Sequence, residues 1–353
     1  MPKSISAKPR KAKAFSLLLV LVGAGTGWFF LKQREESAHS EPTVILHRFQ
    51  TQKPLMGTMV TVTAYAESKE KADAAFANAF ARAAEVDQVA SDYLPDSELT
   101  LFNAAKTNAW VPASDDLLTM VAYGLELAEL TNGAYDPTLG TITHLWRVSK
   151  EAGKLPSAEV RDQARELSGW KLVEVDLDAR KIRKLKVGVR LDLGGLGKGY
   201  AADMMLEALL RNKISSALIT FGGDVRCGEA PPGKNGWMVG LNDYQNKIVA
   251  TMTVSDCAVS TSGDLQQFIE IDGRRYSHVV EPATGLGTTD SLLATVVANN
   301  GLMADPLATA ACINPTLFGE ISPSTNIHSR ILSEDQQQLS SGFPPLEPYT
   351  AEE

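Results

Sequence analysis

The spacing of apolar residues predicts one strand and two helices early in the chain. Residues 59–65, MVTVTAY, alternate with a period of two, which is typical of a strand with one buried face. The next segment, residues 68–89, repeats its apolar residues at helical spacing. These apolar residues are Ala72, Phe76, Ala79, Phe80, Ala83 and Val86. A second helix is expected to open at Ser114, a good N-cap, and to stop at Asn132-Gly133.

Six short runs that contain apolar residues, each with at least one β-branched residue, predict further strands. They are KLVEVD near Lys171, KIRKLK near Lys181, ALITF near Ala217, IVATMTV near Ile248, QQFIEI near Gln266 and LLATVVA near Leu292. Asp272-Gly273 is a typical two-residue turn between FIEI and RRYSHVV, so it predicts a hairpin. Many strands joined by hairpins, with a few helices, indicate an α+β fold with largely antiparallel sheets and packed helices.

The N-terminus carries a different pattern. Residues 1–13 are basic and contain no acid, and residues 14–31 contain no charge. The uncharged run is long enough for a transmembrane helix, although Val22-Gly23-Ala24 also resembles a signal-peptide cleavage site. We expect an uncleaved anchor, because the apolar run continues through Trp28 to Phe30. Basic residues stay on the cytoplasmic side, so the folded body is expected on the outer, periplasmic side of the inner membrane.

Two polar segments flank the expected folded domain, which spans residues 54–332. Residues 32–53 are rich in Ser, Glu, His and Gln and lack a periodic pattern, so they are expected to form a tether. Residues 333–353 are rich in Pro, Gln, Ser and acid, so a disordered tail is expected there. No repeat of solenoid length is present in the sequence.

The overall charge excludes one class of partner. The 353 residues carry a net charge of -8 with a pI near 5.3, whereas a nucleic-acid-binding protein needs a basic face. We therefore expect no nucleic-acid partner. The three cysteines, Cys227, Cys257 and Cys312, match no zinc spacing, and an odd number cannot form a complete disulfide framework. Each is interpreted as a small buried apolar residue.

The most unusual stretch is RLDLGGLGKGYAAD, residues 190–203, which we call the glycine loop. Its glycines and Lys198 lie between a strand-like run and a helix-like run. Backbone N–H groups there, and the N-terminus of a helix starting near Lys198, can approach an anion. The spacing matches neither GxxxxGK[ST] nor GxGxxG, so neither standard nucleotide motif is present. Taken alone, the loop is equally consistent with a tight strand-to-helix turn.

Six other short motifs, each containing Gly or Pro, accompany the glycine loop. They are MGT at 56–58, YDPTLG at 135–140, FGGD at 221–224, STSGD at 260–264, YSHVVEPATG at 276–285 and ADPLATAA at 304–311. In this combination and order, the motifs resemble those of the ApbE family, the FAD:protein FMN transferases. The resemblance runs from about residue 54 to residue 313 and so covers most of the predicted domain.

The resemblance implies a reaction and its partners. Members of this family bind FAD with Mg2+, transfer FMN to a Thr or Ser hydroxyl of an acceptor flavoprotein as a phosphoester, and release AMP. The acceptor is expected to belong to a membrane or secreted electron-transfer system. Two alternatives stay open. One is a Mg2+-dependent FAD pyrophosphatase, in which water replaces the acceptor hydroxyl, and the other is a membrane-tethered flavin-binding protein without turnover.

The resemblance also assigns metal ligands. They are the side chains of Asp305 and Thr309 and the backbone carbonyl of Gly195, with the carbonyl of Ala308 as a further candidate. Asp305 and Thr309 are four residues apart, so a helix places both oxygens on one face, and oxygen ligands suit Mg2+. Asp305 followed by Pro306 also has the form of a helix N-cap, which is the structural alternative.

The same resemblance assigns FAD contacts, and the glycine loop is expected to hold the FAD pyrophosphate beside the metal. The assigned FAD-binding residues are Met56, Tyr93, Ala134, Tyr135, Asp136, Asp192, Lys198 and Val279. Either tyrosine can pack on a flavin or adenine face, and the alternative for each is a half-buried core aromatic. Catalytic roles fall to Lys198, Asp305 and His278. His278 is expected to activate the acceptor hydroxyl or to order that site, with a structural histidine as the alternative.

Overall fold

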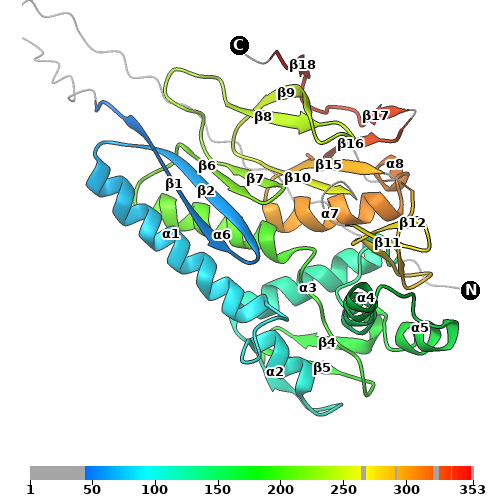
Figure 1. Cartoon of the computed structure of the whole chain (residues 1–353). Helices are drawn as coiled ribbons and strands as arrows, with labels where there is room; N and C mark the ends of the chain where they lie inside the picture. The colour runs from blue at the N-terminus through cyan, green and yellow to red at the C-terminus, as the bar shows by residue number, and fades with distance from the viewer. Residues whose placement is uncertain (1–43, 264–267, 291, 321–325, 335, 351–353) are drawn as a thin grey trace, which may run out of the picture. The chain divides into compact units, whose positions relative to one another are not determined.

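An eight-stranded antiparallel sheet runs through the fold (Figure 1). Its strands, in spatial order, are β1 (His47–Leu55), β2 (Thr58–Ala66), β6 (Ala217–Phe221), β7 (Asp224–Cys227), β10 (Ala258–Gly263), β15 (Leu293–Ala298), β16 (His328–Leu332) and β17 (Gln337–Leu339). Each neighbouring pair in this order is antiparallel. Strands that are distant in sequence, such as β7 and β10, therefore lie side by side.

The computed structural model describes residues 44–263, 268–290, 292–320, 326–334 and 336–350. The predicted basic segment, residues 1–13, and the predicted anchor, residues 14–31, lie outside these residues. Within the described ranges, no helix is both long enough and apolar enough to span a membrane.

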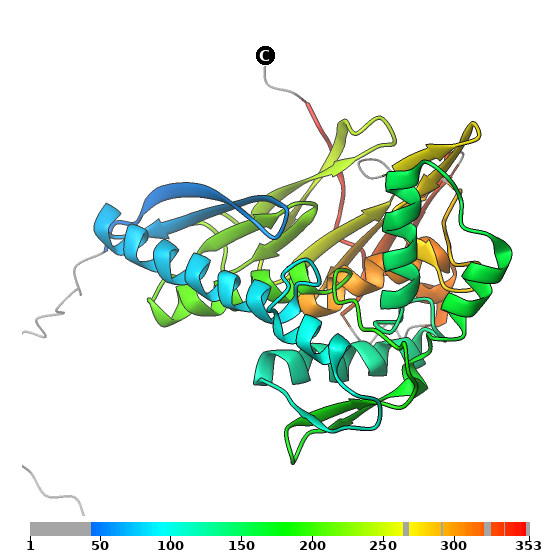
Figure 2. The same cartoon turned by 60° about the horizontal axis from the view of Figure 1, so that its bottom comes forward.

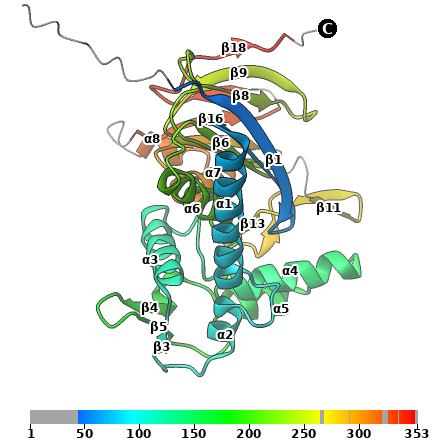
Figure 3. The same cartoon turned by 90° about the vertical axis from the view of Figure 1, so that its left-hand side faces the viewer.

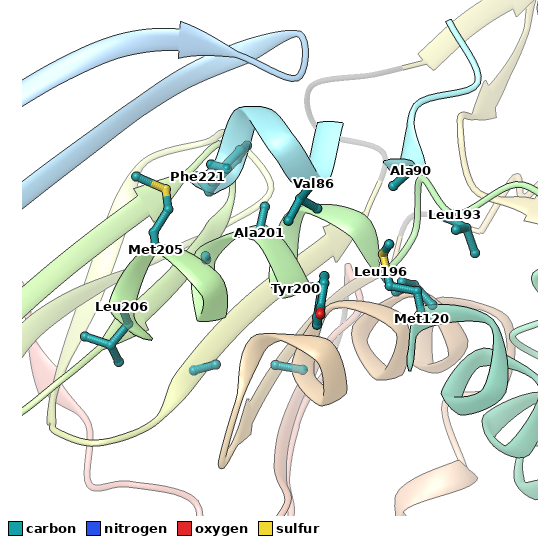
Figure 4. Packing of buried hydrophobic residues seen from close by; sticks show 14 of the residues in the cluster. Val86, Ala90, Met120, Leu193, Leu196, Tyr200, Ala201, Met205, Leu206 and Phe221 are labelled. Atoms are coloured by element: carbon teal, nitrogen blue, oxygen red, sulfur yellow. The ribbon is translucent and has the colours of Figure 1, made fainter. Parts of the chain in front are cut away.

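Three helices pack on one face of the sheet and bury the main core. They are α1 (Lys69–Ala90), α6 (Gly197–Arg211) and α7 (Gly301–Ile313). α1 packs along α6, and α6 packs against α7, which contacts β10 and β15 (Figures 1 and 3). Figure 4 shows apolar side chains meeting in this core, among them Val86 of α1, Leu196 at the start of α6 and Phe221 of β6. Burial of this apolar surface stabilises the helices more than their intrinsic propensity does.

Smaller elements surround this central layer. The other helices are α2 (Glu98–Ala104), α3 (Asp115–Leu130), α4 (Gly140–Ala152), α5 (Ala158–Arg165), α8 (Leu317–Glu320) and the short η1 (Trp170–Leu172). Two three-stranded sheets contain β3 (Val111–Pro112), β5 (Lys181–Lys184) and β4 (Val173–Asp176), and β18 (Glu347–Pro348), β9 (Ile248–Val254) and β8 (Trp237–Asn242). Two hairpins pair β11 (Phe268–Ile271) with β12 (Arg274–Ser277) and β13 (Val280–Glu281) with β14 (Leu286–Gly287). α4 and α5, both green in Figure 2, pack together, and α4 also contacts β13.

The structure confirms the elements that the apolar pattern predicts most directly. β2 covers the alternating segment, and α1 and α3 begin directly after their N-caps, Ser68 and Ser114. Both serine side chains accept a hydrogen bond from a backbone N–H of the first turn. After α3, Asn132 and Gly133 have φ angles of 48° and 81°, and Asp272-Gly273 forms the β11–β12 turn. The predicted α+β fold with antiparallel sheets is confirmed.

Ordered strands extend beyond the predicted domain at both ends. β1 begins at His47, inside the segment 32–53 whose composition predicts a tether, and it pairs along its length with β2. β17 and β18 lie inside the tail 333–353, and the prediction of disorder is wrong for these two strands. In the part of the chain that the structure describes, all three are edge strands with mostly exposed side chains. Polar residues suit such strands, so composition carries no strand signal there.

Helices α6 and α7 meet backbone to backbone at two glycines. A Cβ added to Gly199 would lie 2.1 Å from the carbonyl oxygen of Gly301, and one added to Gly301 would lie 2.2 Å from that of Gly199. One turn along α6, Asp203 accepts hydrogen bonds from the N–H groups of Gly301 and Leu302 at 2.8 and 2.9 Å. Asp203 also accepts one from Arg226 of β7 at 2.8 Å. The first turn of α7 is therefore held against both α6 and β7.

Candidate active site

A lysine stands between two buried aspartates where α6, β7 and α7 meet. Lys198 Nζ lies 2.7 Å from Asp224 Oδ2 and 3.3 Å from Asp305 Oδ2. The N–H of Gly199 donates to Asp305 Oδ2 at 3.0 Å, and the hydroxyl of Ser260 donates to Asp224 Oδ1. We call Lys198, Asp224 and Asp305 the central cluster. It joins the glycine loop to the FGGD and ADPLATAA motifs.

Burial and neighbouring charges set the protonation of the central cluster. Burial, reinforced by the negative charge of Asp224, raises the pKa of Asp305 to about 6, and Lys198 and the Gly199 N–H oppose this rise. Burial alone would lower the pKa of Lys198, but Asp224 and Asp305 together raise it above its ordinary value. Lys198 therefore stays cationic at neutral pH. The two carboxylates outnumber it, so the cluster keeps an excess of negative charge that a further cation would neutralise.

The predicted metal ligands lie together beside the central cluster. Asp305 and Thr309 are one turn apart on α7, with Ala308 fully buried next to Thr309. A Cβ added to Gly195 would lie 3.8 Å from Thr309 Oγ1, so the glycine loop reaches that hydroxyl. Thr309 Oγ1 also lies 3.3 Å from the hydroxyl of Ser262 on β10. Among the described residues, no group of three or more His, Cys, Asp and Glu side chains is arranged to hold a metal ion. A metal at this place would thus depend partly on neutral oxygen ligands.

Asp305 is not the N-cap of its helix. α7 begins at Gly301, and its N-cap is Asn300, whose side chain accepts a hydrogen bond from Met303 N–H at 2.9 Å. Asp305 and Pro306 both lie inside the helix. The capping alternative is therefore wrong, because Asn300 already caps the helix before Asp305 is reached. The Asp305 carboxylate instead reaches across to α6.

The hydroxyl of Tyr135 is buried beside the glycine loop and has no hydrogen-bond partner among the described residues. A Cβ added to Gly195 would lie 3.2 Å from Tyr135 Cε2, so the ring packs directly on the loop. Burial, together with the negative charges of Asp305 and Asp192, raises the pKa of the phenol well above its ordinary value, so it stays protonated. An unsatisfied buried hydroxyl costs about 1–3 kcal/mol. This donor is therefore a candidate contact for a bound ligand.

Asp192 belongs to a second group of charges centred on Arg147 of α4. Arg147 Nη2 lies 3.1 Å from Asp192 Oδ2 and 2.6 Å from Asp92 Oδ2. The guanidinium carbon also lies 4.6 Å from the centroid of the Tyr93 ring, and Tyr93 is 77% exposed. Burial and the charge of Asp192 raise the pKa of Asp92, and Arg147 opposes the rise. Arg147 thus connects two predicted FAD contacts, Asp192 and Tyr93.

The MGT motif forms the two-residue turn between β1 and β2. Met56 and Gly57 have φ angles of 47° and 72°, and Leu55 pairs with Thr58 across the turn. Positive φ at both positions is what a type I′ hairpin turn requires. The Met56 side chain reaches the start of α6, since a Cβ added to Gly197 would lie 3.6 Å from Met56 Cε. The turn therefore borders the glycine loop.

The other predicted residues lie in the core or at the surface of the fold. Asp136 is buried and accepts hydrogen bonds from the N–H and the hydroxyl of Thr138 at 2.8 and 2.6 Å. Ala134 is buried in the main core, and Val279 is buried in a small apolar cluster with residues of β15 and α7. His278 is exposed directly after β12. The contacts of these residues with FAD, and the role of His278, stay predictions.

A family model describes the region that holds these groups. The model of the ApbE family matches residues 56–317, which include the seven sequence motifs and the central cluster. The chain belongs to the ApbE family. It is 29% identical over 279 residues to the FAD:protein FMN transferase of Treponema pallidum (strain Nichols), covering 73% of this chain and 76% of that relative. It is 31% identical over 263 residues to the FAD:protein FMN transferase of Klebsiella pneumoniae (strain 342), covering 71% and 74% of the two chains.

Solved ApbE structures share the fold of this chain. The ApbE protein of Thermotoga maritima MSB8 aligns with a TM-score of 0.76 at 26% identity, covering 84% of this chain and 97% of that one. The flavin transferase ApbE from Vibrio cholerae aligns with a TM-score of 0.74 at 25% identity, covering 85% and 99%. Nearly all of each solved chain is matched, so this ApbE-family chain shares their overall fold.

Four residues that the structure of this ApbE-family chain brings into the site have no role assigned from the sequence motifs. Asp224 and Ser260 lie in the FGGD and STSGD motifs, so a polar residue at each was visible but had no assigned role. Ser262, in the same STSGD motif, approaches Thr309. Arg147 lies in no motif, and only the packing of α4 brings it to the glycine loop. A sequence signal therefore existed for the first three residues but not for Arg147.

Proposed function

We propose that this chain is a Mg2+-dependent FAD:protein FMN transferase. The hydroxyl oxygen of a Thr or Ser in an acceptor flavoprotein attacks the FMN phosphorus of FAD, and the bond from that phosphorus to the AMP part breaks. FMN stays on the acceptor as a phosphoester, the hydroxyl proton is released, and AMP leaves. The observation that carries the proposal is the central cluster beside the glycine loop, in a chain whose relatives are FAD:protein FMN transferases.

The oxygen groups around Thr309 fit a small divalent cation. Asp305 supplies a buried carboxylate, Thr309 a hydroxyl, and Gly195 and Ala308 are the predicted carbonyl ligands. Mg2+ is usually held by one or two carboxylates together with substrate phosphates, so a single carboxylate suits it. The unpartnered hydroxyl of Tyr135 adds a donor for a ligand at the same place. When bound, the ion would neutralise negative charge on the FAD phosphates.

The chain's own groups would bind and orient the pyrophosphate of FAD. The N-cap residue of α6, Leu196, makes no side-chain cap hydrogen bond, whereas the N–H groups of Gly197 and Gly199 already donate to the Leu193 carbonyl and to Asp305 Oδ2. The positive end of the helix dipole would therefore attract the anion. Lys198 adds a fixed positive charge at that end of the helix. Asp192 accepts a hydrogen bond from Gly194 N–H at 2.8 Å and thereby shapes the loop. These groups make the loop suitable for an anion next to a metal.

His278 is proposed to take the proton of the acceptor hydroxyl. Its side chain is exposed at the end of β12, where a residue presented by another protein can reach it. Imidazole is the side chain whose ordinary pKa is nearest to neutral pH, which suits a general base.

The enzyme is further proposed to be held in the inner membrane by residues 14–31, with its folded domain on the periplasmic side. Membranes from cells that produce the full chain therefore serve as the enzyme source, incubated with FAD, Mg2+ and a set of acceptor flavoproteins from membrane or secreted electron-transfer systems. We expect AMP release matched by flavin fluorescence of an acceptor band in a denaturing gel. Both signals should vanish with EDTA and return with excess Mg2+.

The other outcomes of this experiment would favour a different function or a different location for this protein. AMP release without labelling of any acceptor would favour the FAD pyrophosphatase. If neither AMP nor a labelled acceptor formed, the result would favour a flavin-binding protein without turnover. Activity recovered only in the soluble fraction would contradict the anchor at residues 14–31 while leaving the transferase proposal in place.

Tyr135→Phe is expected to lower the rate of AMP release about tenfold while the Tm stays unchanged or rises. The change removes a buried hydroxyl that has no partner in the part of the chain that the structure describes, so no hydrogen bond seen there is lost. A tenfold lower rate corresponds to about 1.4 kcal/mol, which is the size expected for the loss of one ordinary hydrogen bond to a ligand. The measurements are FAD-dependent AMP release and thermal unfolding of the same preparation.

Tyr200→Phe is the matched control for this substitution. The Tyr200 hydroxyl donates to Asp116 Oδ1 at 2.7 Å, so its removal is expected to lower the Tm. If Tyr135→Phe instead lowered the Tm and kept the wild-type rate, its hydroxyl would have a structural partner and no ligand role.

A further inference from the structure

Two of the three cysteines face each other across the β7–β10 pair. Arg226 is opposite Ala258 in this antiparallel register, so its continuation by one residue places Cys227, the last residue of β7, opposite Cys257, which directly precedes β10. The Cys227 N–H donates to the Cys257 carbonyl at 2.8 Å, in agreement with that pairing. Cys227 is fully buried, and Cys257 is half-buried. The interpretation of both as separate apolar residues therefore overlooks their contact.

The backbone holds these two residues at a separation that a disulfide can span. Residues opposite each other on antiparallel strands point their side chains to the same face of the sheet. Their Cα atoms lie about 4.5–5.5 Å apart, and disulfides join Cα atoms that are about 4.4–6.8 Å apart. A bond between Cys227 and Cys257 thus needs no change in the pairing of β7 with β10.

The two thiols have unequal reactivity. Hydrogen bonding with Cys227 lowers the pKa of Cys257, and Arg226 adds to this effect while burial opposes it. The same hydrogen bond and burial raise the pKa of Cys227. The thiolate is the attacking form in thiol–disulfide exchange, and Cys257 is also the more exposed of the pair. Cys257 is therefore suited to attack first and Cys227 to complete the exchange.

Cys227 ends the strand that holds Asp224 of the central cluster, and Cys257 directly precedes the strand that holds Ser260, a partner of Asp224. β7 begins at Asp224 and ends at Cys227. β10 carries Ser260, whose hydroxyl donates to Asp224 Oδ1. Among the described residues, two residue pairs join β7 to β10 in register. A covalent bond at the next position would extend this short ladder and fix the strands that position Asp224.

We propose that Cys227 and Cys257 form a dithiol–disulfide site that covalently joins β7 to β10 beside the central cluster. In the oxidised form the bond closes the segment that contains β8 and β9, which restricts the unfolded chain and stabilises the folded one. The proposal rests on the pairing of β7 with β10 and does not depend on the proposed transferase activity.

Oxidation of the pair requires a disulfide from outside the chain, either a small-molecule disulfide or that of a thiol–disulfide oxidoreductase. The Cys257 thiolate attacks one sulfur of that disulfide and displaces the first thiol. Cys227, after losing its proton, then attacks the Cys257 sulfur and displaces the second thiol. The pair loses two protons and two electrons, and the external disulfide is reduced to two thiols.

Thiol counting in the purified full chain tests the proposal, with glutathione as the redox probe. The protein is equilibrated with mixtures of reduced and oxidised glutathione, quenched with acid, denatured, alkylated with N-ethylmaleimide and weighed. Three alkylated cysteines are expected in reducing mixtures, and one, Cys312, in oxidising mixtures. The oxidised chain should be lighter by two hydrogen atoms before alkylation, with the Cys227 and Cys257 peptides linked.

Two variants complete this experiment. Cys312→Ser is the matched control and is expected to keep the change of two thiols, whereas Cys257→Ser is expected to abolish it. The oxidised wild type should unfold several degrees above the reduced form, and Cys257→Ser should lack this difference. Three alkylated thiols in every mixture, or a stable mixed disulfide with glutathione at Cys257, would overturn the proposal. None of these readouts involves flavin, so failure of the transferase proposal would leave them unchanged.

Discussion

Asp305→Asn is expected to lower the rate of FMN transfer at least about 100-fold without destabilising the fold. The substitution removes the single charged group among the predicted metal ligands and part of the field around Lys198. Burial and the charge of Asp224 raise the pKa of Asp305 to about 6 from an ordinary value of 3.8. Because the folded state favours the protonated form, ionisation of Asp305 costs stability as the pH rises through this range. A neutral asparagine avoids that cost and still accepts from Gly199 N–H.

Rate and stability must be measured on the same Asp305→Asn preparation. AMP release at saturating FAD and Mg2+ gives the rate, and thermal unfolding gives the stability. Asp243→Asn is a suitable control, because its carboxylate accepts from Gln245 and Lys247 in the turn between β8 and β9, away from the central cluster. That variant is expected to keep the wild-type rate. A wild-type rate in Asp305→Asn would contradict the metal role, and a lower Tm would mean that the carboxylate is needed mainly for folding.

Gly199→Ala is expected to lower the free energy of unfolding by at least about 3 kcal/mol. The added methyl would lie 2.1 Å from the Gly301 carbonyl oxygen and 2.9 Å from Asp305 Cβ, so α6 and α7 would have to move apart. Because the Gly301 oxygen belongs to the backbone, no rotation of a side chain relieves the clash. Separation also weakens the contacts of Asp305 with Gly199 N–H and Lys198, so FMN transfer should fall as well. Urea unfolding gives the free energy.

Gly197→Ala, on the same helix, is the control for this effect. A Cβ there would meet Met56 Cε at 3.6 Å and Ala90 Cβ at 3.8 Å, which are ordinary van der Waals contacts. Alanine is also the better helix former, so the free energy of unfolding should stay the same or rise. If the Gly197 and Gly199 variants unfolded alike, the close crossing of α6 and α7 would not depend on glycine at position 199.

The sequence could predict those elements in which one face is buried and the other exposed. β2, α1 and α3 have such faces, so their period of two or of about 3.6 is visible in the order of apolar residues. Motifs predicted a site around the glycine loop, and the structure places Lys198, Gly195, Asp305 and Thr309 together there. The local sequence is enough to predict these residues, because each lies in a short motif at the end of a strand or on a helix.

The remaining features depend on contacts between distant segments. Arg147 bonds Asp192 only because α4 packs beside the glycine loop, and no spacing in the sequence encodes that approach. Cys227 and Cys257 become opposite only through the register of β7 with β10. Asp305 has the form of a cap but does not start its helix for a different reason: Asn300 is also a good cap, and the packing of Gly301 against Asp203 begins the helix there.

The exposed polar strand β1 also bears on how copies of the chain behave toward one another. Within the described residues it forms one edge of the eight-stranded sheet, where unpaired N–H and C=O groups can recruit a strand from another molecule. Arg48 and Lys53 place charge along this edge, and Pro54 lacks an N–H to donate. The polar residues that leave β1 without a strand signal in the sequence therefore also protect the folded chain against edge-to-edge aggregation.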